Sequence, residues 1–269
     1  MPIPTDTIDK LEAIWRSTSE LCRDLDEQQW EGPTDCPGWS VKDNLSHMIG
    51  TERSLEGLPH AEALTEMPDH VKNPIGEFNE GEIEARRNLS GAQVLAEWNE
   101  LVERRQATLR GCGESDFAKE MMTPTGPGTM ADFLNIRVLD CWIHEQDMRR
   151  ALGRPGHGSG PAAEHTVDRL LRTLPIVIGK RAATPEGGAV AVDITGDVQR
   201  RVVCEVNGGR AAFVDTPTNE PLATVTLDSE AFVVLANGRR IAMAMTDRIR
   251  LSGDTALGQR VVENLNMMI

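Results

Sequence analysis

One helix constrains how this chain can fold more than any other segment. The sequence predicts it from Thr129 to about Leu152, because Thr129 and Asp132 form a capping-box pattern and Gly153 follows its end. Apolar residues occur on nearly every face, which predicts that the helix is buried. These residues are Leu134, Ile136, Val138, Leu139, Cys141, Trp142 and Ile143. We therefore expect other helices to surround it in a bundle.

The same helix carries Asp140 and His144, which are four residues apart and share one face. A carboxylate oxygen and an imidazole nitrogen so placed can hold one cation, and a third ligand from another helix would complete an open metal site of the catalytic type. The spacing also occurs by chance and in surface pairs. Buried carboxylates and imidazoles need a metal, a charged partner or a hydrogen-bond network, and the residues alone leave all three open. Arg137 and Asp147 lie on the same face and are expected to be ion-pair partners.

Helical periodicity predicts the remaining members of an up-and-down bundle. The expected helices run from about Thr5 to Asp26, from Ser40 through Leu55, from near Ile75 to about Ser90, and from Ser90 to Gly111. The segment from His60 to Asn73 is expected to be a long connection, and Thr123 to Gly128 a loop. The second helix carries His47 at the flank of its apolar stripe, beside Asn44 and Thr51. That stripe consists of Val41, Leu45, Met48, Glu52 and Leu55.

The character of the sequence changes after a Gly- and Pro-rich run, Arg154 to Pro161, which predicts a linker between domains 1–154 and 155–269. The second domain opens with a helix from about Ala162 to Ile178. Strand-like alternation follows at 189–194, 202–206, 211–214, 223–227 and 248–251, and short helices are expected at 228–235 and 255–267. This pattern predicts a small α+β domain with a mainly antiparallel sheet.

Composition excludes several classes of protein. The net charge of −14, without a basic stripe, argues against nucleic-acid binding. The longest apolar stretches, such as Ala231 to Ala236, are far shorter than the roughly 20 residues that span a bilayer. The N-terminus shows no signal-peptide pattern, and the five cysteines form no C-x-x-C pair, so we expect a cytoplasmic protein. We expect it to be a monomer or a weak homodimer. Cys36 has no basic neighbour in sequence that would indicate a reactive thiol.

One stretch of the sequence is distinctive. Trp30 precedes Pro33-Thr34-Asp35-Cys36-Pro37-Gly38-Trp39-Ser40-Val41-Lys42-Asp43-Asn44-Leu45-Ser46-His47. Together with the segment from Asp140 to Gly153, it resembles the mycothiol-dependent maleylpyruvate isomerase family of actinobacteria, and the resemblance covers nearly the whole chain. It implies an N-terminal DinB-like four-helix metal-binding domain and a C-terminal sterol-carrier-like α+β domain. Both agree with the organisation predicted from periodicity.

The resemblance also implies a ligand set and a cofactor. Zinc, or another divalent cation, would be bound by His47, Asp140 and His144, and mycothiol would be the thiol cofactor. The family pattern has Glu where this chain has Asp140, so either the helices lie closer together or coordination is looser. Glu145 is adjacent but points about 100° away on a helix. An anionic substrate would need a cationic partner, for which Arg239 in Gly238-Arg239-Arg240 is our candidate.

Three functional hypotheses follow from the resemblance. The first is a zinc-dependent enzyme that uses mycothiol to isomerise maleylpyruvate to fumarylpyruvate, or a mycothiol S-transferase that acts on another electrophile. The second is a non-catalytic protein that binds a metal and a small ligand. The third is a degenerate member in which Asp140 no longer supports a metal.

Overall fold

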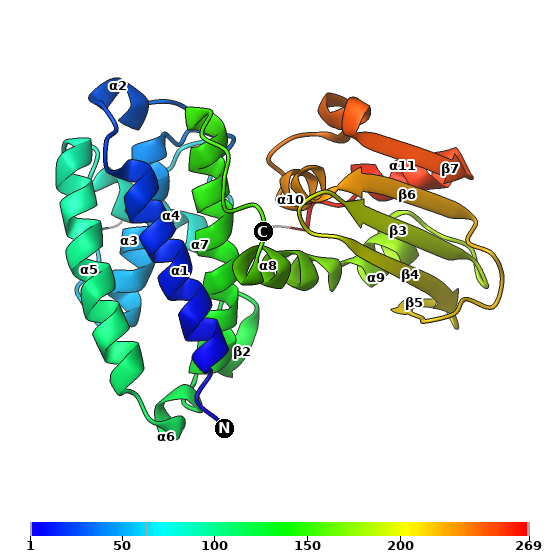
Figure 1. The fold of residues 1–269 in the computed structure, drawn as a ribbon, viewed down its shortest axis with the longest axis horizontal. Coiled ribbons are helices and arrows are strands. Elements are labelled where there is room, and N and C mark those ends of the chain that lie inside the picture. Colours follow the sequence, from blue (N-terminus) through cyan, green and yellow to red (C-terminus); the bar gives the residue numbers. More distant parts are fainter. Residues whose placement is uncertain (1, 63, 268–269) are drawn as a thin grey trace. The chain divides into compact units, whose positions relative to one another are not determined.

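The chain folds into two units joined within the Gly- and Pro-rich run. The computed structural model describes residues 2–62 and 64–267 and divides into Met1–His157 and Gly158–Ile269 (Figure 1). Gly156 and Gly160 on either side of the division both have positive φ angles, 158° and 91°. Because Gly160 lies in a region that side chains disfavour, glycine suits this turn between the units.

Four long helices dominate the described part of the first unit. They are α1 (Thr5–Cys22), α3 (Val41–Leu55), α5 (Gly91–Gly111) and α7 (Met130–Leu152). Helix α7 packs against α1 and α3, and α5 packs against the same two helices (Figure 1). The predicted helical bundle is confirmed, with α7 buried along most of its length.

Local hydrogen bonds fix where three of these helices begin. Ser40, Ser90 and Thr129 are the N-caps of α3, α5 and α7, and each forms a reciprocal capping box with the third residue of its helix. Helix α7 ends at Gly153, whose φ of 61° is the left-handed conformation of a helix C-cap. These are the caps that the sequence predicts.

The shorter elements depart from the predictions in several places. The helix expected from near Ile75 to about Ser90 begins at Pro74 and ends already at Glu84. Helix α1 ends at Cys22 instead of Asp26, because the Asp26 side chain caps a separate short helix by accepting from the Gln29 amide. The expected loop before α7 is partly a β-hairpin, in which Gly126 turns the chain with a φ of 110°. The shorter elements are α2 (Glu27–Trp30), α4 (Pro74–Glu84), α6 (Glu114–Phe117), β1 (Glu120–Thr123) and β2 (Gly126–Thr129).

The second unit contains a five-stranded sheet with the strand order β5-β4-β3-β6-β7. The strands are β3 (Ala189–Thr195), β4 (Arg200–Asn207), β5 (Arg210–Phe213), β6 (Ala223–Asp228) and β7 (Ile249–Gly253). Strands β3 and β6 pair in parallel, and the other neighbours are antiparallel. The sheet is therefore mixed but mainly antiparallel, as predicted.

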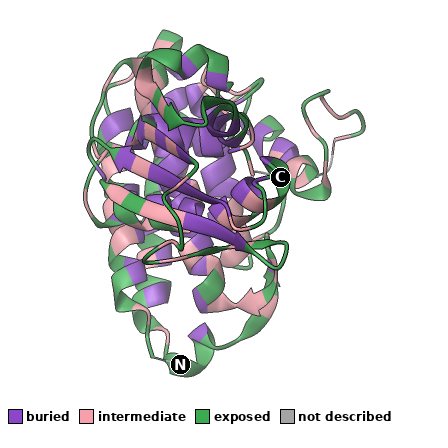
Figure 2. Cartoon of the chain, turned by 90° about the vertical axis from the view of Figure 1, so that its right-hand side faces the viewer, coloured by how far each residue is buried: buried purple, intermediate pink, exposed green. Residues whose placement is uncertain are grey.

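Helices cover this sheet. They are α8 (Pro161–Leu171), α9 (Leu174–Ile176), η1 (Val177–Arg181), α10 (Ser229–Ala236), η2 (Ala242–Arg248) and α11 (Thr255–Glu263). Helices α10 and α11 pack on β6, whose alternate residues are buried, and the central strand β3 is buried along most of its length (Figure 2). The single helix expected from Ala162 to Ile178 is interrupted, because Pro175 lacks the amide hydrogen that a continuous helix requires. None of the described helices combines the length and the hydropathy of a bilayer-spanning segment.

The close contact between Gly91 and the buried Trp30 yields a test of this packing. A Cβ atom at Gly91 would lie 2.0 Å from Trp30 Cδ1, whereas a Cβ atom at Gly111, in the same helix, would meet nothing within 4 Å. We expect Gly91→Ala to lower the free energy of unfolding by about 1–3 kcal/mol through overpacking. Gly111→Ala is the control and should be neutral or stabilising. Urea unfolding of both variants measures the difference, and equal midpoints would contradict the packing.

Candidate metal centre

The predicted ligand residues meet where α3 packs against α7. His47 lies on α3, and Asp140 and His144 lie one turn apart on α7. His47 Nε2 is 3.2 Å from Asp140 Oδ2, and His144 Nε2 is 3.6 Å from Asp140 Oδ1. The two imidazole rings meet edge to face with centroids 4.6 Å apart. The structure therefore brings these three side chains together.

This donor set fits a zinc ion. The candidate ligand atoms of His47, Asp140 and His144 all lie within 4.8 Å of one another. Tetrahedral zinc with bonds of about 2.0–2.2 Å places neighbouring ligand atoms roughly 3.3–3.6 Å apart. His47 Nε2 and His144 Nε2 lie 3.2 and 3.6 Å from different oxygens of Asp140, so either oxygen is near an imidazole nitrogen. Both histidines are buried, but the Asp140 side chain keeps 24% of its exposure. Of the three side chains, that of Asp140 is the most accessible to solvent.

Asn44 determines which nitrogen of His144 faces the site. The amide hydrogens of Asn44 are donated to Thr34 Oγ1 and to the Ser40 carbonyl at 3.0 and 2.9 Å. Its Oδ1 atom is thus directed at His144 Nδ1, 2.8 Å away. Because Nδ1 donates to this oxygen, the lone pair of the neutral ring belongs to Nε2, which faces Asp140.

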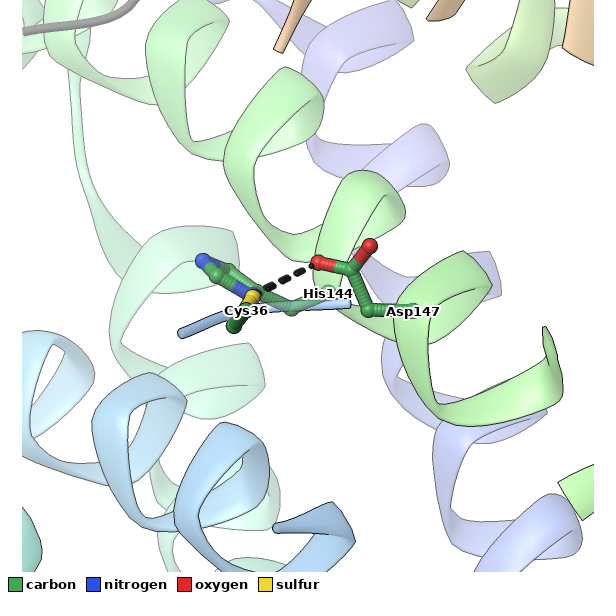
Figure 3. Close-up of side chains that lie close together, drawn as sticks. All are labelled: Cys36, His144 and Asp147. Carbon is green, nitrogen blue, oxygen red and sulfur yellow. Dashed lines mark hydrogen bonds and ion pairs between the residues drawn. The ribbon is translucent and has the colours of Figure 1, made fainter. Parts of the chain in front are cut away.

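A second group of possible ligands, Cys36, His144 and Asp147, lies on the other side of the His144 ring. Figure 3 shows the Cys36 thiol directed at the Asp147 carboxylate, and Sγ is 3.1 Å from Oδ2. Asp147 also forms an ion pair with Arg150, as expected of a residue on this face. Since Asn44 occupies His144 Nδ1 and Asp147 is already paired, we interpret this group as hydrogen-bonded support for His144.

The surroundings shift the pKa values of the three candidate ligands in different directions. Burial alone would raise the pKa of Asp140, but the charges of Arg137 and His47 outweigh it and hold that pKa well below its usual range. Burial lowers the pKa of His47 more than Asp140 raises it. For His144 burial also acts downward, yet hydrogen bonds to Asp140 and Asp147 hold its pKa well above the usual range.

A chain of buried ion pairs extends from the site into the bundle. Arg137 pairs with Asp140 and donates through Nε to Glu52 Oε1 at 2.9 Å, which confirms its expected role as an ion-pair partner. Arg105 on α5 donates to Glu52 Oε2 at 2.9 Å and to Glu56 at 2.7 Å. Burial alone would raise the pKa of Glu52, but Arg137 and Arg105 outweigh it and lower that pKa. Charges on α3, α5 and α7 are thereby linked.

Trp39 forms a wall beside both histidines. Its ring centroid is 5.2 Å from that of His47 and 5.7 Å from that of His144. The indole nitrogen donates to Glu80 Oε1 at 2.6 Å, and the same oxygen is 2.8 Å from His70 Nε2. Gly38, with a φ of 77°, precedes Trp39, and a Cβ atom there would lie 2.9 Å from the His70 ring. Glycine is therefore required at this point of the distinctive stretch.

Arg239 belongs to the second unit. It lies in the turn after α10, is half-buried, and donates to the Asn237 carbonyl at 3.3 Å. Its contact with substrate stays a prediction. Glu145 is turned toward α1, where it accepts from the Ser17 hydroxyl at 2.6 Å, so it does not join the three ligand residues.

Several residues of the site were not predicted from the sequence. Asn44, Trp39 and Cys36 contact His144 across about a hundred residues, and no local pattern reports such contacts. Glu52 is different, because a carboxylate on the apolar stripe of an amphipathic helix signals a buried partner. Because a buried carboxylate needs a cationic partner, Glu52 together with Arg137 and Arg105 on other predicted helices indicates the chain of ion pairs.

Fold and ligand group together define a two-domain protein: the first unit is a helical bundle that carries a His/Asp/His cluster, and the second unit is an α+β domain. The family model described as "Mycothiol maleylpyruvate isomerase N-terminal domain" matches residues 11–149, and that of the "SCP-2 sterol transfer family" matches residues 169–266. The chain belongs to the mycothiol maleylpyruvate isomerase family.

Solved structures share the fold, and two curated sequences match part of the chain. A crystal structure of the mycothiol-dependent maleylpyruvate isomerase superimposes with a TM-score of 0.60 at 17% identity, covering 94% of this chain and 93% of that one. A histidine-to-alanine mutant of that isomerase gives a TM-score of 0.55 at 18% identity over the same shares. Two uncharacterized proteins from two strains of Mycobacterium tuberculosis are each 25% identical over 135 residues, 49% of this chain. That match spans about half the length of these relatives, 51%.

The orientation of His144 can be tested through Asn44. We expect Asn44→Leu, which removes the acceptor for Nδ1, to weaken zinc binding about 10–100-fold, because outer partners of a ligand histidine set its orientation. Asn44→Asp keeps an acceptor oxygen and should bind zinc more tightly than Asn44→Leu. Competition with a chromophoric chelator measures both affinities, and circular dichroism checks folding. Equal affinities of the two variants would show that this hydrogen bond does not matter.

The lowered pKa of Glu52 predicts a pH-dependent contribution to stability. A folded-state pKa below the unfolded value of about 4.3 means that the carboxylate stabilises the fold at higher pH, and that this is lost as pH falls through the folded value. Glu52→Gln should therefore lower the free energy of unfolding by about 1.5–3 kcal/mol near pH 7, and the difference from wild type should shrink below about pH 4.3. Urea unfolding from pH 7 to acid measures this. Glu84→Gln, at a half-exposed surface pair, is the matched control and should show little difference at any pH.

Proposed function

We propose that this protein is a zinc-dependent enzyme that uses mycothiol as a cofactor and isomerises maleylpyruvate or a closely similar substrate. The observation that carries the proposal is the convergence of His47, Asp140 and His144 within 4.8 Å, between α3 and α7 of a bundle in this family. A fold match across 94% of the chain to a mycothiol-dependent maleylpyruvate isomerase supports the same assignment. Five free cysteines agree with a reduced, cytoplasmic setting.

When bound to these ligands, zinc would supply a Lewis acid that lowers the pKa of a thiol toward neutrality. The isomerisation then needs the thiolate sulfur to add to one carbon of the cis double bond, which becomes a single bond as a proton is taken up at the other end of the conjugated system. Rotation about that bond and loss of the same thiol and proton give the trans product. The thiol is regenerated, so it acts as a cofactor.

The residues of this chain prepare the site for that chemistry. Asn44 and Asp147 orient His144, and Arg137 holds Asp140. Trp39 covers the two imidazole rings and limits the access of water to them. A substrate with two carboxylates is poorly matched to a chain of net charge −14, and we propose that Arg239 supplies the compensating cation.

Metal analysis tests the ligand set. We expect His47→Ala to weaken zinc binding more than about 100-fold, since loss of a direct ligand should exceed the effect of an outer partner. His60→Ala removes a histidine with a half-exposed side chain and should retain wild-type zinc. Zinc content after dialysis, together with chelator competition, gives the answer. Absence of zinc from wild type, or equal zinc in the two variants, would refute the site.

Thiol dependence tests the reaction. Absorbance of maleylpyruvate should change with enzyme plus mycothiol and remain unchanged when the thiol is omitted, and His47→Ala should abolish the difference. Arg239→Ala should raise KM because a partner of a substrate carboxylate is lost. Isomerisation without thiol would refute the mechanism. Zinc binding and thiol binding without isomerisation would favour S-transfer to another electrophile.

A further inference from the structure

Arg137 is a buried cation of the first unit whose side chain is fixed by several partners. Its side chain is 2% exposed, and each guanidinium nitrogen has a partner. Nη1 donates to Asp140 Oδ2, Nε to Glu52 Oε1 at 2.9 Å, and Nη2 to Cys141 Sγ at 3.0 Å. A planar group held at three points cannot turn away without breaking buried hydrogen bonds.

The partner of Arg137 is itself fixed. Glu52 has no exposed side-chain surface, and its second oxygen accepts from Arg105, which is equally buried and also pairs with Glu56. Removing one partner from such a buried pair leaves an uncompensated charge. The position of Arg137 is therefore determined by α3 and α5 as well as by its own helix.

The two carboxylate oxygens of Asp140 have different interaction partners. Oδ2 accepts from Arg137 and lies 3.2 Å from His47 Nε2, whereas Oδ1 lies 3.6 Å from His144 Nε2. A carboxylate with one oxygen committed to a guanidinium has one oxygen left to donate strongly to a cation. The guanidinium charge also opposes a second cation nearby, so Asp140 becomes a weaker donor than an unpaired carboxylate.

We infer that Arg137 is a positioning residue that makes Asp140 a one-oxygen ligand and limits how tightly the site holds its cation. This inference rests on the proposed metal site. If only one oxygen of Asp140 donates electron density, a bound ion would keep more positive charge. A more positive ion lowers the pKa of a bound thiol further, and this activates the thiol. The buried chain through Glu52 and Arg105 is the device that keeps Arg137 in place.

The proposed role and a merely structural role of Arg137 predict opposite changes in cation affinity when this residue is removed. Removal of Arg137 as a structural element should loosen the site and weaken cation binding. Under the inference, removal of its charge frees the second oxygen of Asp140 and tightens cation binding. The variant Arg137→Met/Glu52→Gln removes both partners together, so that no buried carboxylate is left unpaired.

Cation affinity and cobalt spectroscopy test the inference. We expect the double variant to bind zinc about tenfold more tightly than wild type, because a positive charge beside the cation is removed. Arg137→Lys keeps that charge and should stay within a few-fold of wild type. In cobalt(II)-substituted protein, the visible absorption of the double variant should weaken, as coordination by a second carboxylate oxygen raises the coordination number. Glu52→Gln alone is the matched control for the second substitution.

The outcomes separate this inference from the proposed function. Zinc binding by wild type together with equal or weaker binding by a folded double variant would overturn the role of Arg137 and leave the metal site intact. An unchanged cobalt spectrum would overturn the one-oxygen coordination. Failure of wild type to bind zinc would overturn the proposed function and this inference together. If the double variant does not fold, the same comparison is made with Arg137→Gln, which keeps a hydrogen-bond donor but loses the charge, and equal or weaker binding by that variant overturns the inference.

Discussion

The buried ion pair between Glu52 on α3 and Arg137 on α7 is the interaction on which the candidate site depends. Both side chains are withdrawn from water, which is tolerable only while they remain paired. The pair therefore fixes how α3 and α7 lie against each other. His47 is five residues before Glu52, and Asp140 is three residues after Arg137, so the same register that satisfies the charges sets His47 against Asp140. The same packing of α3 against α7 therefore satisfies the buried charges and brings the ligand group together.

The two histidines are held to different degrees. His144 is fixed on its far side by Asn44, with Cys36 and Asp147 close by, and its pKa is raised. His47 meets Asp140 through Nε2, while its buried Nδ1 has no hydrogen-bond partner among the described residues. In the proposed site, His144 would therefore be the rigid ligand and His47 the ligand that can adjust. We propose that this adjustment would let an aspartate, one methylene shorter than the glutamate of the family pattern, bind the same cation.

Local signals made much of the fold predictable, and long-range contacts made the rest unpredictable. The start of a helix is predicted by a capping pattern that spans four residues, as at Ser40, Ser90 and Thr129. The spacing of Asp140 and His144 is likewise a pattern within about one helical turn. The end of α1 and the hairpin before α7 were mispredicted, because weak local preferences compete there. The contact of Asn44 with His144 depends on how two helices pack, which no local pattern encodes. His47 entered the prediction through the family resemblance rather than through its neighbours.

The residues proposed to bind the metal and the residue proposed to bind the substrate belong to different units of the chain. His47, Asp140 and His144, with the groups that orient them, all belong to the first unit, whereas Arg239, the proposed substrate contact, belongs to the second. Activation of a thiol is common to isomerisation and to S-transfer, so the geometry of the bundle supports both. Discrimination between them depends on which carbon skeleton is presented to the sulfur, and hence on residues outside the ligand group. A metal-binding measurement therefore tests the ligand group, whereas the substrate is tested by the assay with maleylpyruvate and mycothiol and by the KM of Arg239→Ala.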